Sequence, residues 1–157
     1  MTTNNQTKLS FSLNLVQQAP RSPHTRLGGF ALLPRLIDKC RADIMGNIGE
    51  YLSDCAIDQE FLKFTGIDYE ALRAQIAEDK TDYEILQWVR ENSSPNRAAW
   101  EISQWTQYQE RRAPEPHTEA ATYFLDVLQN LNSKRGDITG WSDLLDLDDY
   151  CSFGGRA

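Results

Sequence analysis

The sequence contains no long apolar segment. No stretch approaches the roughly 18 consecutive apolar residues that span a bilayer, and residues 1–18 show neither a sustained apolar run nor a small-residue cleavage pattern. The three cysteines, Cys40, Cys55 and Cys151, are odd in number and far apart, which is a poor basis for a disulfide framework. We therefore expect a cytoplasmic protein with reduced thiols and no membrane contact.

Motifs for metals and phosphate cofactors are also missing. No C-x-x-C or H-x-x-x-H spacing occurs among the cysteines and His24 or His117, so no metal site is predicted. Neither the G-x-x-x-x-G-K-[ST] nor the G-x-G-x-x-G pattern occurs, and no cofactor is predicted. Cys40 falls on an apolar helical stripe and Cys55 follows an aspartate, so a cysteine nucleophile is not favoured.

Positive charge is scarce but concentrated near the N-terminus. The net charge is −7, yet residues 1–41 hold six basic residues and one acid. An acidic protein that collects its cations in one stretch has a place there for an anionic partner. The candidate contacts lie in an irregular arm, which begins at Pro20, and in the helix that follows it. They are Arg21, Arg26, Gly28, Gly29, Arg35, Asp38 and Lys39.

The arm could hold an anion through two kinds of donor. Arginine and lysine side chains donate charged hydrogen bonds to phosphates and carboxylates, and Gly28-Gly29 lets backbone N–H groups approach the same ligand. The alternative is that these cations pair with acids of the chain itself. Acids available for such pairs include Asp38, Asp43, Asp54 and Asp58. The sequence leaves both interpretations open.

The pattern of apolar residues predicts an all-α fold. A chain of 157 residues with sixteen aromatic side chains fits one domain with a substantial core. We expect a loosely ordered tail over residues 1–19 and one compact helical domain over 20–157, with a core region at 20–112 and C-terminal helices within 116–150. At most a minimal hairpin is expected near Gly49.

Periodicity and capping residues set the expected helices. The first begins near Pro34 and ends at Gly46, and the last docks through Trp141 and the leucines after it, with Ser142 as its cap. Tyr108 and Leu125 are expected on buried stripes. Asp58, Asp68 and Thr81 are the expected caps of three short helices. Between the first and last helices we expect helices over 58–65, 68–79, 81–91, 95–111 and 117–134.

Several segments resemble those of a known family. They are Pro20-Arg21-Ser22-Pro23, Leu27-Gly28-Gly29, the run from Leu33 to Ala42, Gly49-Glu50-Tyr51 and the run from Asp58 to Asp68. Together they are similar to an uncharacterised bacterial family catalogued as domain of unknown function number 5069. The resemblance extends from about Pro20 to Trp105. It implies a single, mostly helical domain and carries over no activity.

The function expected from these features is non-enzymatic binding. The partner would be an anionic small molecule or an acidic protein held by the basic arm; the sequence does not indicate the oligomeric state. An alternative is a small enzyme acting on a phosphorylated or carboxylated metabolite, with Asp38 or Asp58 as acid or base. The short helices over 58–91 also resemble helix-turn-helix proteins. However, the candidate reading helix carries acids that would repel phosphate, so nucleic acid is the least favoured partner.

Overall fold

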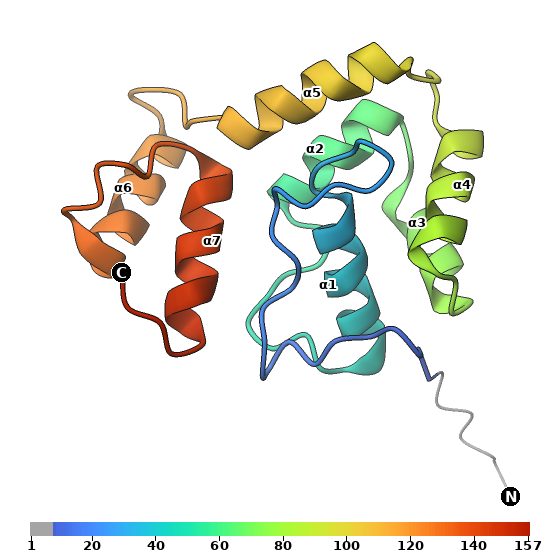
Figure 1. Cartoon of the computed structure of the whole chain (residues 1–157), viewed down its shortest axis with the longest axis horizontal. Helices are drawn as coiled ribbons and strands as arrows, with labels where there is room; N and C mark the ends of the chain where they lie inside the picture. The colour runs from blue at the N-terminus through green and yellow to red at the C-terminus, as the bar shows by residue number, and fades with distance from the viewer. Residues whose placement is uncertain (1–7) are drawn as a thin grey trace, which may run out of the picture.

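The computed structural model describes residues 8–157, and all regular elements in that range are α-helices (Figure 1). The all-α class predicted from the sequence is confirmed. None of the described helices is long and apolar enough to cross a membrane. The helices of residues 8–157 are α1 (Leu33–Met45), α2 (Ala56–Thr65), α3 (Tyr69–Ala77), α4 (Asp82–Asn92), α5 (Ala99–Arg111), α6 (Glu119–Asn132) and α7 (Trp141–Ser152).

The segment before the arm is held against the helices. Residues 1–7 of the expected tail lie outside the described residues. In the remainder, Leu9 and Leu15 are buried, and the Leu15 N–H donates to the Asn47 carbonyl at 3.0 Å. This segment therefore packs on the loop that follows α1.

Several helices begin or end at the capping residues that the sequence predicts. Gly46 and Gly66 close α1 and α2 with positive φ angles of 73° and 69°, the left-handed conformation that glycine adopts without strain. Asp68 accepts the Ala71 N–H at the start of α3. Thr81 and Glu84 form the predicted capping box of α4. Local sequence signals therefore fix these boundaries.

Three predicted starts are wrong. α2 begins at Ala56 with Cys55 as its cap, and Asp58 instead completes the capping box from inside the helix. α5 begins at Ala99 and not at 95, because the Ser94 N–H donates to Thr65 and keeps that segment extended across the end of α2. α7 is capped by Gly140, while the Ser142 hydroxyl donates to the Gln109 carbonyl.

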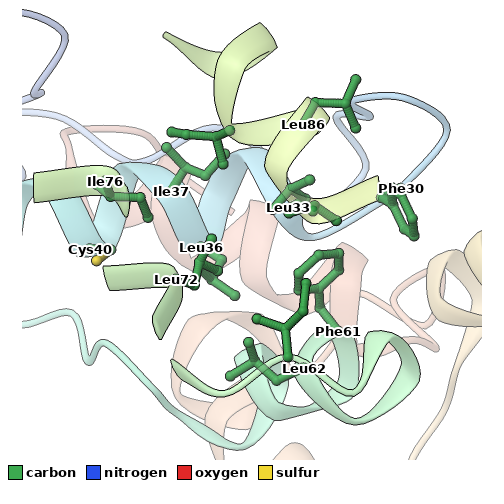
Figure 2. Packing of buried hydrophobic residues seen from close by; sticks show 13 residues of the cluster. Phe30, Leu33, Leu36, Ile37, Cys40, Phe61, Leu62, Leu72, Ile76 and Leu86 are labelled. Atoms are coloured by element: carbon green, nitrogen blue, oxygen red, sulfur yellow. The ribbon is translucent and has the colours of Figure 1, made fainter. Parts of the chain in front are cut away.

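Helix α1 lies at the centre of the main hydrophobic cluster. Its residues 33–42 are all buried, and it packs on α2 and α3. Phe30, at the end of the arm, points toward Phe61 of α2, and the rings meet edge to face at 5.4 Å (Figure 2). Phe64 of α2 stacks on Trp105 of α5 at 4.7 Å. Each such pair contributes about 0.5–1.5 kcal/mol of stability beyond that from buried area. These contacts join the arm to α2, and α2 to α5.

Helices α6 and α7 form a second, smaller cluster. They lie together on one side of the molecule, and α5 spans from them to the α1–α4 side (Figure 1). The expected burial of Leu125 and Tyr108 is wrong, since each is 61% exposed. α6 packs chiefly on α7, so only a narrow stripe around Phe124 is covered. The buried face of α5 is formed by Thr106 and Gln109, with Ile102 and Trp105 partly buried against the main cluster.

Candidate functional site

Four charged residues of α1, Arg35, Asp38, Lys39 and Arg41, are buried, and each meets an opposite charge from a different element. The arm, α2, α4 and α7 each supply one partner. Such burial is costly unless every charge is paired and hydrogen-bonded. The N–O distances of the pairs are 2.9 Å for Arg21–Asp38, 2.8 Å for Lys39–Asp58, 3.0 Å for Arg41–Asp82 and 2.7 Å for Arg35–Asp149.

These pairs use the donors that the sequence assigned to an anion. Lys39 Nζ lies 2.8 Å from Asp58, 3.0 Å from the Leu52 carbonyl and 3.2 Å from Cys55 Sγ, which accounts for all three ammonium protons. Arg21 donates through Nε and Nη2 to both oxygens of Asp38, each at 2.9 Å. The charged groups of Lys39 and Asp38 thus already have hydrogen-bond partners within the chain.

A tyrosine contacts both members of the Arg35–Asp149 pair. The Tyr51 hydroxyl donates to Asp149 at 2.7 Å, and the Arg35 guanidinium lies over the Tyr51 ring. Burial and the carboxylate of Asp149 both raise the pKa of Tyr51 above its ordinary value. Tyr51 is therefore a permanent hydrogen-bond donor that ties the loop after α1 to α7.

The surface has a hollow of about 520 Å³ beside Arg21 and another of about 510 Å³ beside Arg26. Arg21 and Arg41 line the first, but so do Asp38 and Asp82, which neutralise them. The second, which we call the arginine groove, has three arginines and no acidic residue among the described residues that line it. Its lining is Arg26, Gly28, Gly29, Phe30, Arg90, Ser93, Asn96, Arg97, Ala99, Ile102 and Ser103.

The arm reaches the arginine groove through a tight two-residue turn. Leu27 and Phe30 exchange both backbone hydrogen bonds at 3.0 Å, and Gly28 and Gly29 between them have φ angles of 59° and 87°. Positive φ at both central positions is the geometry that a Gly-Gly pair favours. Neither glycine N–H donates a hydrogen bond within residues 8–157. Two glycines of the lining thus have backbone donors without a partner in the described residues.

Helix α5 holds this turn in place. The Thr106 hydroxyl donates to the Gly29 carbonyl at 2.6 Å and accepts the Ala31 N–H at 3.0 Å. Thr106 is fully buried, so the turn is fixed to α5 on both sides of Phe30. The turn is therefore a rigid wall of the groove.

The three arginines differ in how strongly they are engaged. Arg26 forms a two-pronged pair with Glu110 at the surface. Arg97 donates to the Phe64 carbonyl, lies over the Phe64 ring 4.6 Å from its centre, and lies 3.5 Å from the Glu101 carboxylate. Arg90, on the last turn of α4, is exposed and has no ion-pair partner among residues 8–157. The groove therefore offers one guanidinium without an ion pair in residues 8–157 and two that already pair with glutamates outside the lining.

The predicted anion contacts fall into two groups in the structure. Arg26, Gly28 and Gly29 line the arginine groove, whereas Arg21, Arg35, Asp38 and Lys39 belong to the buried pairs. Sequence analysis missed Arg90 and Arg97 as members of the groove. Their one local signal is that they flank the Ser-Ser-Pro loop between α4 and α5.

Comparison with known families identifies the chain. A family model described as a domain of unknown function (DUF5069) matches residues 17–151, which include the arm, α1 to α6 and all but the last residue of α7. The chain belongs to this family. Membership confirms the resemblance seen in the sequence, and the family's description assigns no activity. None of the curated proteins compared matches the chain.

Replacing Lys39 with methionine should destabilise the fold. The change leaves Asp58 buried without its cation, and breaking a buried pair in this way costs about 3–5 kcal/mol. Chemical denaturation measures the free energy of unfolding. Arg73→Ala, which breaks the surface pair with Asp43, is the control and should cost no more than about 1 kcal/mol. Equal losses of unfolding free energy in the two variants would show that the Lys39–Asp58 pair stabilises the fold no more than a surface pair does.

Asp82 should contribute to stability in acid. Burial alone favours its neutral form, but the hydrogen bond from Arg21 and the charge of Arg41 outweigh burial and lower the pKa of Asp82. This contribution is present above the ordinary aspartate pKa of about 4 and is lost as pH falls through the lowered value. Below about pH 4, the free energy of unfolding should therefore fall less steeply with decreasing pH for Asp82→Asn than for the wild type. Asp126→Asn, at an exposed position, should retain the wild-type slope.

Gly28→Ala should destabilise the turn more than Gly29→Ala. Both positions have positive φ, which costs a residue with a side chain about 1–2 kcal/mol. A Cβ on Gly28 would also overlap the buried Leu86 side chain, whereas a Cβ on Gly29 would meet Ile102 at 3.4 Å. Thermal denaturation of the two variants compares the effects. Equal melting temperatures would show that Leu86 does not confine the turn.

Proposed function

We propose that this protein is a non-enzymatic binding module that holds an anionic ligand in the arginine groove. The observation that carries the proposal is the charge of the lining. In a chain with a net charge of −7, three arginines and the Gly28-Gly29 turn meet in a hollow that no described acid lines, although Arg26 and Arg97 pair with Glu110 and Glu101 outside the lining. The ligand would be a small molecule with phosphate or carboxylate groups, or an acidic segment of a protein.

The donors of the groove suit such an anion. Guanidinium groups bind phosphate and carboxylate through two parallel hydrogen bonds. The Gly28-Gly29 N–H groups and the polar side chains of Ser93, Asn96 and Ser103 add neutral donors on other walls. Phe30 and Ile102 give the groove an apolar part. This combination favours an anion attached to an organic body.

The lining also favours binding over catalysis. No described lining residue is Asp, Glu, His, Cys, Lys or Tyr, the side chains that most often transfer protons in enzymes. The acids considered for an enzyme, Asp38 and Asp58, are buried against Arg21 and Lys39. The enzyme alternative therefore has less support than the binding module.

DNA reading through α4 has less support as well. Of the acids on this helix, Asp82 pairs with Arg21 and Arg41 and Glu84 caps the helix, but Glu91 is exposed without an ion pair in residues 8–157 and would repel phosphate. Arg90 alone projects from its end into the arginine groove. The proposal takes the protein to be bacterial and cytoplasmic; its three cysteines are free thiols, which fits a reducing compartment.

Removing two groove cations should weaken anion binding. We would titrate phosphate, citrate, ATP and a short DNA duplex into the wild type and into Arg26→Gln/Arg90→Gln by calorimetry. A charged hydrogen bond is worth about 1.5–3 kcal/mol, so the affinity for the best anion should fall at least about tenfold. Arg73→Gln/Arg135→Gln changes the net charge equally at remote surface positions and should bind like the wild type.

Two results would contradict the proposal. In one, no anion binds the wild type, or both double variants bind equally well. In the other, the duplex binds best and its affinity falls steeply with salt, which would indicate a nucleic-acid protein.

A further inference from the structure

A second groove, of about 740 Å³, lies where α2 and α5 meet α6 and α7. Its walls are the start of α2, the end of α5, the connection 112–118 and the first turns of α6, with Trp141 of α7 between them. It shares no lining residue with the arginine groove. We call it the tyrosine groove, because Tyr108 and Tyr123 line it from α5 and α6.

The tyrosine groove is largely apolar and aromatic. Ile57, Ala113 and Pro114 contribute aliphatic surface, and Tyr123 stacks on Trp141 with ring centres 6.4 Å apart. Tyr108 and Tyr123 remain 61% and 64% exposed although they face a hollow. Exposed aromatic residues that gather around a groove mark an interaction site more often than scattered ones do.

The charge of this groove is opposite to that of the arginine groove. Glu60, Glu115 and Glu119 line it, and Arg112 is its one basic residue among those described. Arg112 lies 3.9 Å from Glu60, which also accepts a hydrogen bond from Gln109. Glu115 and Glu119 have no ion-pair partner within residues 8–157. Two free carboxylates therefore stand beside the exposed tyrosines.

We propose that the tyrosine groove binds an extended, proline-containing basic segment of a partner protein. Polyproline II segments have no internal hydrogen bonds and dock in grooves lined by aromatic rings, which hold the proline rings. Arginine or lysine side chains of the same segment would pair with Glu115 and Glu119 and lie over the tyrosine rings. The aromatic rings thus provide the apolar contacts and the glutamates select the charge.

Charge disfavours a second copy of this chain as the occupant. Each chain carries a net charge of −7, so two copies repel each other, and the groove itself adds two free acids. The Pro20-Arg21-Ser22-Pro23 segment of the arm has a suitable composition, but its arginine is held by Asp38. The occupant is therefore a segment of another protein.

The test is a selection from a random twelve-residue phage-display library on the folded full chain. The wild type is the target, and phage that bind Tyr108→Ala/Tyr123→Ala are removed. The expected result is a set of peptides rich in proline and in arginine or lysine, and poor in aspartate and glutamate. A synthetic peptide of the consensus should bind at least tenfold more weakly to Tyr108→Ala/Tyr123→Ala. The same loss is expected for Glu115→Gln/Glu119→Gln.

Matched variants outside the groove serve as controls. Tyr150→Ala removes a tyrosine of similar exposure from α7, and Glu70→Gln/Glu91→Gln removes two exposed acids from α3 and α4. Both should bind the peptide like the wild type. Circular dichroism and melting temperatures establish that each variant is folded. If the tyrosine variant fails to fold, the glutamate variant is used for the removal step and for the affinities.

Four outcomes would overturn the proposal. The first is that no peptide is enriched on the wild type over the variant, and the second is that the enriched peptides are acidic or lack proline. The third is that a peptide of equal charge with glycine in place of proline binds equally well, because charge alone would then explain binding. The fourth is a wild-type dimer in solution that Tyr108→Ala/Tyr123→Ala converts to a monomer. None of these outcomes depends on the arginine groove, so the two proposals fail separately.

Discussion

The fold depends on four ion pairs that surround α1. A central helix buried over residues 33–42 would normally be apolar on all sides, but this one carries Arg35, Asp38, Lys39 and Arg41. Hydrophobic contacts are not directional, whereas each of these charges is stable only against one opposite charge. Since the partners come from the arm, α2, α4 and α7, the pairs select one arrangement of these elements around α1.

The same pairs determine which part of the arm can bind a ligand. Arg21, at its beginning, is held against Asp38 and Asp82, which anchors the arm beside α1. Beyond that anchor the chain turns at Gly28-Gly29 and is fixed to α5 by Thr106. The arm is thus structural in its first half and exposed to a ligand in its second. Arg90 and Arg97 join Arg26 only because this anchor brings the turn to the junction of α4 and α5.

Local physics explains what the sequence could predict. The left-handed glycines at 46 and 66 and the Thr81–Glu84 capping box depend on residues within one turn, so these helix boundaries were predictable. The partners of the arm cations were not, because Arg35 meets Asp149 across 114 positions of sequence. Helical periodicity likewise cannot reveal that α6 packs mainly on α7, which leaves Leu125 exposed. The candidate site was predictable only at Arg26, Gly28 and Gly29.

The position of the arginine groove in an acidic protein has a consequence for binding. At distances beyond about 10 Å, an approaching anion experiences the net charge of −7, and salt screens that repulsion. Within the groove it meets guanidinium and N–H donors at contact distance, where screening is weaker.

Salt therefore relieves the long-range repulsion while it weakens the local attraction. For a compact anion the two effects oppose each other, so its affinity changes little with salt. A long polyanion carries many charges outside the groove, where they meet the net charge of −7, so long-range repulsion opposes its binding more strongly. The electrostatics of the whole molecule thus favour a compact anion over nucleic acid at the same set of arginines.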